Sequence, residues 1–329
     1  MSKRHLFHEE SMTSFIGIEG GGSTTRVFIQ RDDQEPEYFE FPISLKVRNG
    51  DFAASAEKLR RIVGAHGNAP NIRNSQFAIR NLALGLSGMS REEDQELLRA
   101  AIVALPEFAD ARIHIESDAT LTLKSVLAEG EEGILLIAGT GSVIFYQPSG
   151  GAARRIGGWG PLLSDEGSGY RIGLRALRHY VNALDGVYPR DALCEAMDTR
   201  IGVTEIPITP RSLTQRAESD PAFVASFARD ALEAAMNDPD PPSRKHIQDL
   251  VYEELIDLTT MIFPLTIPGV MSGSKPYNLY LAGGVARQPI TTRLLEQAYE
   301  DDDYFTLHLV DDRAPAFKGL EIARGMSEP

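Results

Sequence analysis

The sequence predicts an α/β protein built from two related halves. Strand-like apolar runs alternate with amphipathic helical segments along most of the chain, which is the pattern of sheets covered by helices. The length of 329 residues favours two domains over a single core. Two apolar runs that end in glycine turns, at 15–20 and 133–138, each open a new series of strands and helices. This near-repeat indicates that the two halves share one architecture.

The first half is predicted to contain a glycine hairpin followed by alternating helices and strands. Residues 15–30 have the pattern of two antiparallel strands around a glycine cluster. Apolar residues at helical spacing predict a helix over 51–65, with Asp51 as its cap. The same periodicities predict further strands at 36–41, 77–86 and 112–116, and further helices at 91–105 and 119–129. This order predicts a sheet with mixed strand directions.

The second half begins with another glycine hairpin, over 133–147, and is richer in helix. Residues 154–168, which hold several glycines and the only tryptophan, are expected to be loop, and 237–243 an exposed helix breaker. Periodicity predicts helices over 170–184, 189–198, 212–236 (interrupted at 220–221), 245–263, 289–300 and 314–326, and strands over 278–282 and 305–310. Small residues of the last helix suit close packing between domains; they are Ala316, Gly319 and Ala323.

Composition and charge narrow the class of protein. A hydrophobic content of 42% and a charged content of 24% are typical of soluble globular proteins. The net charge of −14 argues against binding of nucleic acid or acidic membranes, and no apolar run is long enough to span a bilayer. The single cysteine, Cys194, excludes a disulfide or a cysteine-built cluster within this sequence, so a cytoplasmic location is expected. Residues 1–13 are expected to be a flexible tail without the features of a signal peptide.

The cluster Gly20, Gly21 and Gly22, followed by the hydroxyls of Ser23, Thr24 and Thr25, is a candidate anion site. Consecutive glycines let backbone N–H groups approach a ligand, and hydroxyls donate to phosphate oxygens. This is not a Walker A loop, because no G-K-[ST] follows. A tight hairpin without a ligand is the alternative for this stretch alone. Similar turns recur at 139–141, 157–160 and 283–284, and four of them favour a nucleotide whose charge is met by Mg²⁺ and dipoles.

Two acidic positions are candidates for chemistry. Asp118 lies where a strand ends and a helix begins, so the helix N-terminus favours its ionised form and makes it available as a base; a simple N-cap is the alternative. Asp165 and Glu166 form an acidic pair in a glycine-rich loop, for which solvated loop acids or a helix cap are the alternatives. The histidines after the N-terminal tail have no metal-binding spacing and receive no role; they lie at 66, 114, 179, 246 and 308.

Six segments occur in one order along the chain: IGIEGGGSTTRVFI, LALGLSG, ESDATLTL, GILLIAGTGSVIF, GGWGPLLSDEGSGYRIG and YLAGGVA. Together they resemble the N-acetylglucosamine kinase branch of the BadF/BadG/BcrA/BcrD ATPase family, within the superfamily of sugar kinases, Hsp70 and actin. The succession of GTGS, GGWG and DEGSGY is the specific part of the resemblance, and residues 185–272 are the least diagnostic.

The resemblance implies two ribonuclease-H-like, actin-like domains flanking a cleft, with domains at 14–130 plus 314–329 and at 131–313. It implies an ATP site whose residues are Gly20, Gly21, Gly22, Ser23, Thr24, Thr140, Gly141, Ser142, Gly283 and Gly284. It implies a sugar site whose residues are Ser87, Gly88, Gly158, Trp159, Gly160 and Asp165, beside Asp118 as catalytic base. Glu19 would orient Mg²⁺ through water.

The implied activity is phosphoryl transfer from ATP to a hydroxyl of an amino sugar or hexose, with N-acetylglucosamine or glucosamine as the first expectation. The sequence departs from the family in one loop, because Leu45 stands where an asparagine usually binds the sugar. Lys46 and Arg48 would suit a sugar acid, although exposed loop bases are the alternative. An activator-type ATPase is a further alternative, disfavoured by the single cysteine. A sugar is the expected partner, and a homodimer stays open.

Overall fold

The computed structural model describes residues 14–31, 34–47, 50–65, 79–202, 209–267, 269–300 and 303–326. The chain divides into two compact units, Met1–Val126 with Arg313–Pro329, and Leu127–Asp312. They are called unit 1 and unit 2 below, and each is described by itself. The expected tail at 1–13, the segment 66–78 and the loop positions Arg48 and Asn49 lie outside the described residues. No helix among the described residues is long and apolar enough to cross a membrane.

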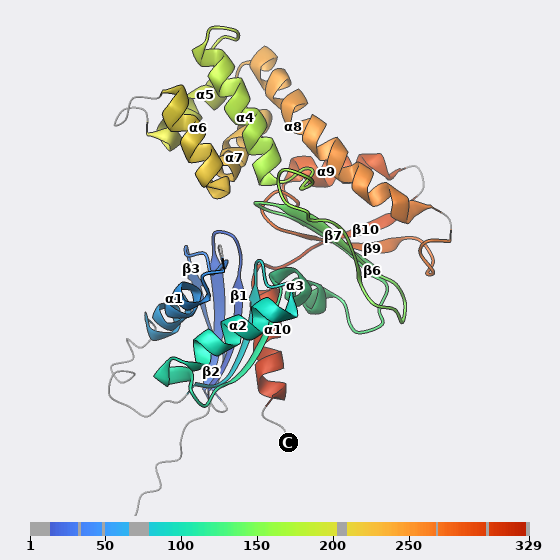
Figure 1. Ribbon diagram of the computed structural model, residues 1–329. Coiled ribbons are helices and arrows are strands. Elements are labelled where there is room, and N and C mark those ends of the chain that lie inside the picture. Colours follow the sequence, from blue (N-terminus) through green and yellow to red (C-terminus); the bar gives the residue numbers. More distant parts are fainter. Residues whose placement is uncertain are drawn as a thin grey trace, which may run out of the picture. The chain divides into compact units, whose positions relative to one another are not determined.

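Unit 1 is built on a five-stranded sheet of order β3-β2-β1-β4-β5 (Figure 1). The strands are β1 Ser14–Gly20, β2 Thr25–Arg31, β3 Glu37–Phe41, β4 Ile79–Leu86 and β5 Arg112–Glu116. The first three form an antiparallel meander, and β4 and β5 continue parallel to β1. The predicted mixed sheet and its hairpin are therefore confirmed.

Helices cover both faces of this sheet. They are α1 Phe52–Ala65, α2 Glu92–Val103, α3 Asp118–Val126 and α10 Ala314–Gly325, with a 3₁₀ turn at Pro106–Phe108. Side chains of α1 and α2 share a core with Ile16 and Ile18 of β1. The alternate face of β1 carries Gly17, and that of β4 carries Gly85, which let α10 and α3 approach the sheet closely. Asp51 caps α1 as predicted, because its Oδ1 accepts a hydrogen bond from Ala54 N at 2.9 Å.

The small residues of α10 pack inside unit 1. The sequence had suggested that they would pack between domains, and that expectation was wrong. Gly17 of β1 lies so close to α10 that an added Cβ would stand 2.1 Å from Leu320 N and 2.3 Å from Ala316 O. A Cβ added to Gly319 would in turn lie 3.2 Å from Gly17 Cα. The C-terminal helix is therefore a backbone-to-backbone partner of the first strand.

Unit 2 repeats the topology of unit 1 with a sheet of order β10-β9-β6-β7-β8. Its strands are β6 Gly133–Ala138, β7 Ser142–Gln147, β8 Arg154–Gly157, β9 Tyr277–Ala282 and β10 Phe305–Leu309. β6, β7 and β8 form the antiparallel meander, and β9 and β10 run parallel to β6. The prediction of two related halves is confirmed. The expectation that 154–168 is entirely loop was wrong, because residues 154–157 complete the meander as β8.

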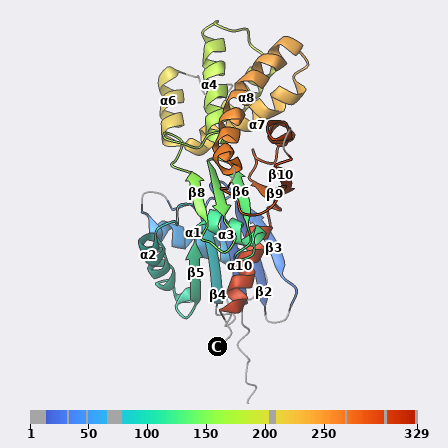
Figure 2. The same ribbon diagram turned by 90° about the vertical axis from the view of Figure 1, so that its right-hand side faces the viewer.

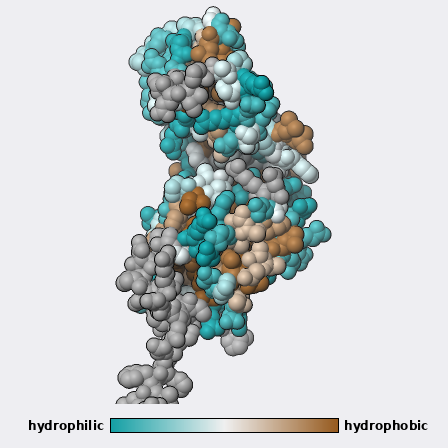
Figure 3. All heavy atoms as spheres, turned by 60° about the vertical axis from the view of Figure 1, so that its left-hand side comes forward, coloured by the Kyte–Doolittle hydropathy of each residue, from teal (hydrophilic) through white to brown (hydrophobic). Residues whose placement is uncertain are grey.

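A thick helical layer packs against the unit 2 sheet (Figures 1 and 2). Its helices are α4 Gly169–Leu184, α5 Ala192–Ile201, α6 Pro210–Ser219, α7 Pro221–Asn237, α8 Pro241–Ile262 and α9 Pro289–Ala298, with a 3₁₀ turn at Phe263–Thr266. Gly173 lets α4 approach the backbone of Val224 in α7. Hydrophilic residues predominate on the outer surface of this layer (Figure 3).

Two expectations for the helical layer are corrected. The segment 189–198 is not helical from its start, since α5 begins at Ala192 after the N-cap Asp191. The segment 237–243 is not a fully exposed breaker, because α8 already begins at Pro241 and Asp238 is only 3% exposed. The Asp238 carboxylate accepts hydrogen bonds from Asp240 N at 2.9 Å and Ser243 Oγ at 2.6 Å. Proline is tolerated in the first turn of α8 because those N–H groups have no helical partner.

Candidate active site

In unit 1, the sheet register brings three candidate segments to one edge. Gly20 at the end of β1 pairs with Leu86 at the end of β4, and Gly85 pairs with Glu116 at the end of β5. The glycine turn at 21–24, Ser87 and Asp118 each follow one of these strand ends. Carboxyl ends of parallel strands are where ligands bind in open α/β sheets. The fold therefore collects a phosphate-binding turn, a hydroxyl and a carboxylate in one place.

The glycine turn between β1 and β2 is closed by a hydrogen bond from Gly21 N to Thr24 O at 3.0 Å. Ser23 is exposed and Thr24 is half-buried. Across the described ranges, neither hydroxyl has a hydrogen-bond partner, whereas the Thr25 hydroxyl donates to Ile43 O at 2.6 Å. The Ser23 and Thr24 hydroxyls are thus available as donors to a ligand beside the glycine backbone. The Thr25 hydroxyl has a structural role.

Leu45 lies behind the glycine turn and faces the core. It is 1% exposed, and a Cβ added to Gly20 would be 2.9 Å from the Leu45 Cβ. Ser44 anchors the same loop by donating from Oγ to Gly21 O at 3.2 Å. Lys46, the next residue, is exposed. Leu45 therefore supports the turn from inside, and its side chain has no access to a sugar.

Asp118 is the first residue of α3 but is not its cap. Ser117 caps the helix, because its Oγ accepts a hydrogen bond from Thr120 N at 3.0 Å. The half-buried Asp118 carboxylate accepts a hydrogen bond from the adjacent Ala119 N at 2.9 Å, and the Ser87 hydroxyl is a second donor to it. The N-cap alternative for Asp118 is thereby removed, and the carboxylate is left to face the sheet edge.

Burial raises the pKa of Asp118 above that of an ordinary aspartate. The Ala119 N–H, the Lys46 ammonium and the Ser87 hydroxyl oppose this shift without cancelling it. The sequence predicted the opposite effect on Asp118, because a helix N-terminus favours the ionised form of a carboxylate. The structure shows that loss of solvation is the larger effect, and a raised pKa suits a base that works near neutral pH.

Glu19, the candidate metal-orienting residue, is a buried and paired carboxylate. It is 8% exposed, and its Oε2 lies 3.0 Å from Arg26 Nη1 on the facing strand. Its Oε1 lies on the side of the turn, 3.2 Å from the position of a Cβ added to Gly21. The Glu19 carboxylate thus pairs with Arg26 next to the candidate phosphate turn, and one oxygen faces that turn.

In unit 2, the corresponding turn at 139–141 is fixed against the start of α4. Gly139 O accepts a hydrogen bond from Gly169 N at 2.7 Å, and Thr140 O accepts one from Tyr170 N at 3.0 Å. Ser142 is 4% exposed and donates from Oγ to Glu166 O at 2.7 Å. Within the part of the chain that is described, the half-buried Thr140 hydroxyl has no partner. Thr140 is therefore the free side-chain donor of this turn.

Asp165 covers the same turn. A Cβ added to Gly141 would lie 2.8 Å from Asp165 Oδ2, and Asp165 is 6% exposed with a left-handed φ of 64°. An aspartate in this conformation is strained unless the surrounding structure holds it. The loop before it presents Trp159, which is 70% exposed and lies under the Arg155 guanidinium at 5.0 Å from its ring centre. Asp165 is thus buried against the turn, whereas the Trp159 side chain is largely exposed.

Gly283 and Gly284 follow β9, which pairs in parallel with β6. Gly283 has a φ of 91°, and a Cβ on it would collide with Ala138 O at 2.4 Å. No atom lies within 4 Å of a Cβ added to Gly284. Val285 N and Ala286 N both donate to Ala138 O, at 2.9 and 3.1 Å. This turn therefore shares the edge of the unit 2 sheet with Thr140 and leaves open space at Gly284.

Sequence reasoning missed the residues that hold the candidate carboxylates. Arg26 was not recognised as the partner of Glu19, although the hairpin register places the two opposite each other. Glu116 and Lys124 form an ion pair that ties β5 to α3, on either side of Asp118. His114 and Lys124 lower the pKa of Glu116 although burial alone would raise it. The pairing of Glu19 with Arg26 could have been predicted from the hairpin pattern of the sequence. The ion pair between Glu116 and Lys124 could be recognised only in the folded structure.

Comparisons with known proteins identify relatives that are sugar kinases. The chain is 32% identical to the N-acetyl-D-glucosamine kinase of Dictyostelium discoideum over 197 residues, 58% of this chain and 61% of that protein. It is 28% identical to a glucosamine kinase of Vibrio cholerae over 190 residues, 56% of this chain and 60% of that protein. The matches thus span about 60% of the length of these relatives. Their names confirm the predicted resemblance to the N-acetylglucosamine kinase-like branch.

Solved structures agree at the level of the fold. A candidate N-acetylglucosamine kinase from Chromobacterium violaceum has a TM-score of 0.68 at 22% identity, covering 95% of this chain and 99% of its own. A ROK family glucokinase from Streptomyces griseus has a TM-score of 0.54 at 11% identity, covering 95% of this chain and 99% of its own. The predicted α/β fold of two similar halves is confirmed. Because the model of the BadF/BadG/BcrA/BcrD ATPase family matches residues 16–243, the chain belongs to that family.

Proposed function

We propose that this protein is an ATP-dependent sugar kinase that transfers the γ-phosphoryl group to a hydroxyl of an amino sugar, N-acetylglucosamine or glucosamine in the first place. The observation that carries the proposal is Asp118, a carboxylate with a raised pKa that is not used as a helix cap. It shares a sheet edge with a glycine turn whose hydroxyls have no partner among the described residues. The relatives named as N-acetyl-D-glucosamine kinase and glucosamine kinase support the acceptor class.

Asp118 acts as the general base. The acceptor hydroxyl oxygen forms a bond to the γ-phosphorus, the bond from that phosphorus to the β–γ bridging oxygen breaks, and ADP leaves. The hydroxyl proton passes to the Asp118 carboxylate. Lys46 and Ser87 counter the effect of burial on the Asp118 pKa and so favour the ionised form that accepts the proton. Positioning and charge neutralisation account for most of the barrier reduction in phosphoryl transfer.

The glycine turns bind the nucleotide phosphates. Ser23 and Thr24 in unit 1 and Thr140 in unit 2 donate hydroxyl hydrogen bonds, and glycine N–H groups add to them. Ser142 acts through the backbone, because its hydroxyl already donates to Glu166 O. Mg²⁺, when bound with ATP, neutralises charge on the β- and γ-phosphates. Glu19 would hold the ion through water, which fits the position of its Oε1 beside the turn.

Recognition of the acceptor cannot use the side chain at position 45. Leu45 is buried behind the turn, so the contact that an asparagine makes in related kinases is replaced by other groups. Ser87, Asp165 and the exposed face of Trp159 are the groups that we assign to the sugar. Lys46, exposed and close enough to Asp118 to affect its pKa, would favour a sugar acid as a second acceptor class.

The test is a screen for sugar-dependent ADP release with Mg-ATP over amino sugars, hexoses and sugar acids. We expect release above background with N-acetylglucosamine or glucosamine. ATP hydrolysis that is independent of every sugar would contradict the proposal and favour an activator-type ATPase. The product of the positive reaction identifies the phosphorylated hydroxyl by NMR.

Gly284→Ala tests the nucleotide site without disturbing the fold. Because nothing lies within 4 Å of the added Cβ, the thermal midpoint should not change. If the nucleotide lies against Gly284, the methyl group occupies its space, and an overpacked contact typically costs about 1–3 kcal/mol, so KM for ATP should rise about tenfold. Gly325→Ala, which also has open space around its Cβ, is the matched control. An unchanged KM for ATP in Gly284→Ala would remove Gly284 from the site.

A further inference from the structure

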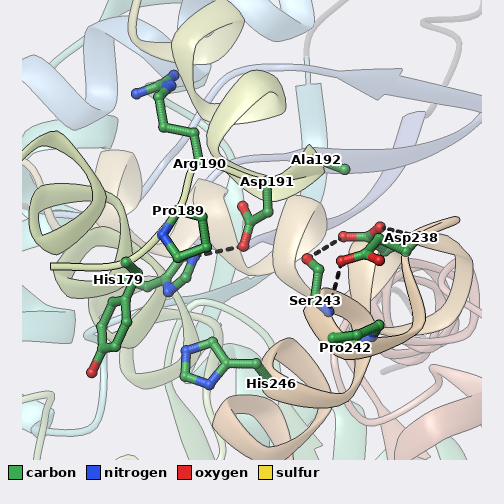
Figure 4. A pocket seen from close by; sticks show the side chains of 11 residues that line it. His179, Pro189, Arg190, Asp191, Ala192, Asp238, Pro242, Ser243 and His246 are labelled. Atoms are coloured by element: carbon green, nitrogen blue, oxygen red, sulfur yellow. Dashed lines mark hydrogen bonds and ion pairs between the residues drawn. The ribbon is translucent and has the colours of Figure 1, made fainter. Parts of the chain in front are cut away.

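The helical layer of unit 2 contains a cavity of about 350 Å³ that the proposed reaction does not use. It lies between the end of α4, the connection to α5 and the first turn of α8 (Figure 4). Its walls include two histidines, His179 and His246, whose ring centres are 5.1 Å apart. Three carboxylates also line it: Asp191, Asp238 and Asp240. Imidazoles mixed with carboxylates are the side chains from which proteins build transition-metal sites.

Three metal-ligating side chains converge beside this cavity, and two of them, His179 and Asp191, line it. His179 of α4, Asp191 at the N-cap of α5 and Cys194 in the first turn of α5 have ligand atoms that all lie within 4.8 Å of one another. His179 Nε2 is 2.8 Å from Asp191 Oδ2 (Figure 4). His179 is 4% exposed and Cys194 is 0% exposed. The capping bond from Cys194 N to Asp191 Oδ1, at 2.9 Å, fixes the carboxylate and the thiol on one helical turn.

A buried ion pair between His179 and Asp191 is the simpler explanation, and it accounts for only part of the site. Among the described residues, the buried Nδ1 of His179 has no hydrogen-bond partner. Nδ1 is the second ring nitrogen, whereas Nε2 faces Asp191 Oδ2 and is the nitrogen available to an ion held by both residues. The Cys194 thiol is a further neighbour of both His179 and Asp191. The Arg190 side chain is not available as a further partner, because it extends away (Figure 4) and pairs with Asp198.

The types of ligand atom at this site indicate which metal ion it would bind. An imidazole nitrogen, a thiolate sulfur and a carboxylate oxygen suit Zn²⁺ and Co²⁺, whereas Mg²⁺ and Ca²⁺ prefer all-oxygen sites. Zinc–ligand bonds of about 2.0–2.3 Å place the ligand atoms of a tetrahedral site about 3.5 Å apart. The three side chains therefore need only small rotations from their present positions to surround an ion. The cavity gives access and room for water as a fourth ligand.

We propose that His179, Asp191 and Cys194 form a binding site for Zn²⁺, separate from the site of phosphoryl transfer. The bound ion would join the end of α4 to the start of α5 and so stabilise the helical layer against unfolding. Binding displaces one proton from the Cys194 thiol and one from the His179 imidazolium, because metals bind the deprotonated forms. A ligand that binds the folded state alone raises its stability by mass action.

Cobalt titration of the metal-free full-length protein tests the site directly. Because Cys194 is the only cysteine in the sequence, a thiolate-to-cobalt charge-transfer band in the near ultraviolet reports on this residue alone. We expect the band to saturate at one Co²⁺ per chain and to be abolished by one equivalent of Zn²⁺. Zn²⁺ should also raise the thermal midpoint of the metal-free protein. Absence of the charge-transfer band at excess Co²⁺ would overturn the proposal, and this result does not depend on any variant.

Variants add a second line of evidence. Cys194→Ser should abolish the charge-transfer band and weaken Zn²⁺ binding at least tenfold. His308→Asn, which changes a histidine on β10 that contacts Asn278, should change neither. Equal Zn²⁺ affinity in the Cys194→Ser and unchanged proteins would place the ion elsewhere and overturn the assignment. Sugar-dependent ADP release is measured separately in Zn²⁺-free buffer, so failure of the zinc site and failure of the kinase proposal are distinguishable.

Discussion

Asp118→Asn is expected to lower kcat for sugar phosphorylation by about 10²–10⁴-fold, the usual contribution of a general base. The amide keeps the shape of the side chain and its acceptor for Ala119 N, but it cannot take the proton from the acceptor hydroxyl. Binding of ATP should change little, because the glycine turns and their hydroxyls are untouched. Steady-state ADP release measures kcat, and nucleotide titration of the variant measures ATP binding.

Asp110→Asn is the matched control, because Asp110 is an exposed aspartate of the same unit. Its kcat should equal that of the unchanged protein. Retention of sugar-dependent ADP release in Asp118→Asn at more than about a tenth of the original rate would contradict the role of base. Equal loss of ATP binding and kcat would instead point to a damaged site.

The raised pKa of Asp118 gives this prediction a pH signature. As pH falls through that pKa, the base becomes protonated and kcat/KM should decrease, with a midpoint above about 3.9, the ordinary value for aspartate. In the same window the folded state binds the proton more tightly than the unfolded state, so its stability falls as pH rises. Asp118→Asn should therefore match or exceed the thermal midpoint of the unchanged protein at neutral pH, and the gain should disappear in acid.

Gly17→Ala is expected to destabilise unit 1 by more than about 3 kcal/mol, beyond the usual cost of an overpacked core. The added methyl would overlap Leu320 N at 2.1 Å and Ala316 O at 2.3 Å, both backbone atoms that cannot move without shifting α10. Since β1 ends in the glycine turn, sugar-dependent ADP release should be lost as well. Hydrogen exchange measured on peptides from β1, β4 and α10 should show the loss of protection.

Gly64→Ala is the matched control for this substitution. Gly64 lies in α1, and no atom lies within 4 Å of an added Cβ. Replacing a helical glycine with alanine should stabilise the protein by about 0.5–1 kcal/mol. A Gly17→Ala protein with the stability and exchange pattern of Gly64→Ala would show that α10 does not depend on contact with β1.

Local patterns were enough to predict the repeated architecture. Alternating apolar residues around Gly20–Gly22 and Gly139–Gly141 predicted two hairpins, because the period of a strand is two residues and a tight turn needs glycine. The sheets confirm them, with identical strand orders in the two units. The predicted cap at Asp51 was confirmed for the same reason: a cap is a contact between neighbours in sequence. The family followed from motifs of this local kind.

Contacts between distant residues were decided by the tertiary structure alone. The pKa of Asp118 rises because the fold buries its carboxylate, against the opposing effects of Lys46 and Ser87, and a sequence displays the helix start but not the burial. Leu45, which the sequence placed at a sugar-binding position, is a core residue, and the small residues of α10 pack against β1. His179, Asp191 and Cys194 have no spacing typical of a metal site, yet the turn from α4 to α5 brings them together. Sequence periodicity determines where helices and strands form. Which side chains are buried, and which distant side chains meet, depends on how those helices and strands pack.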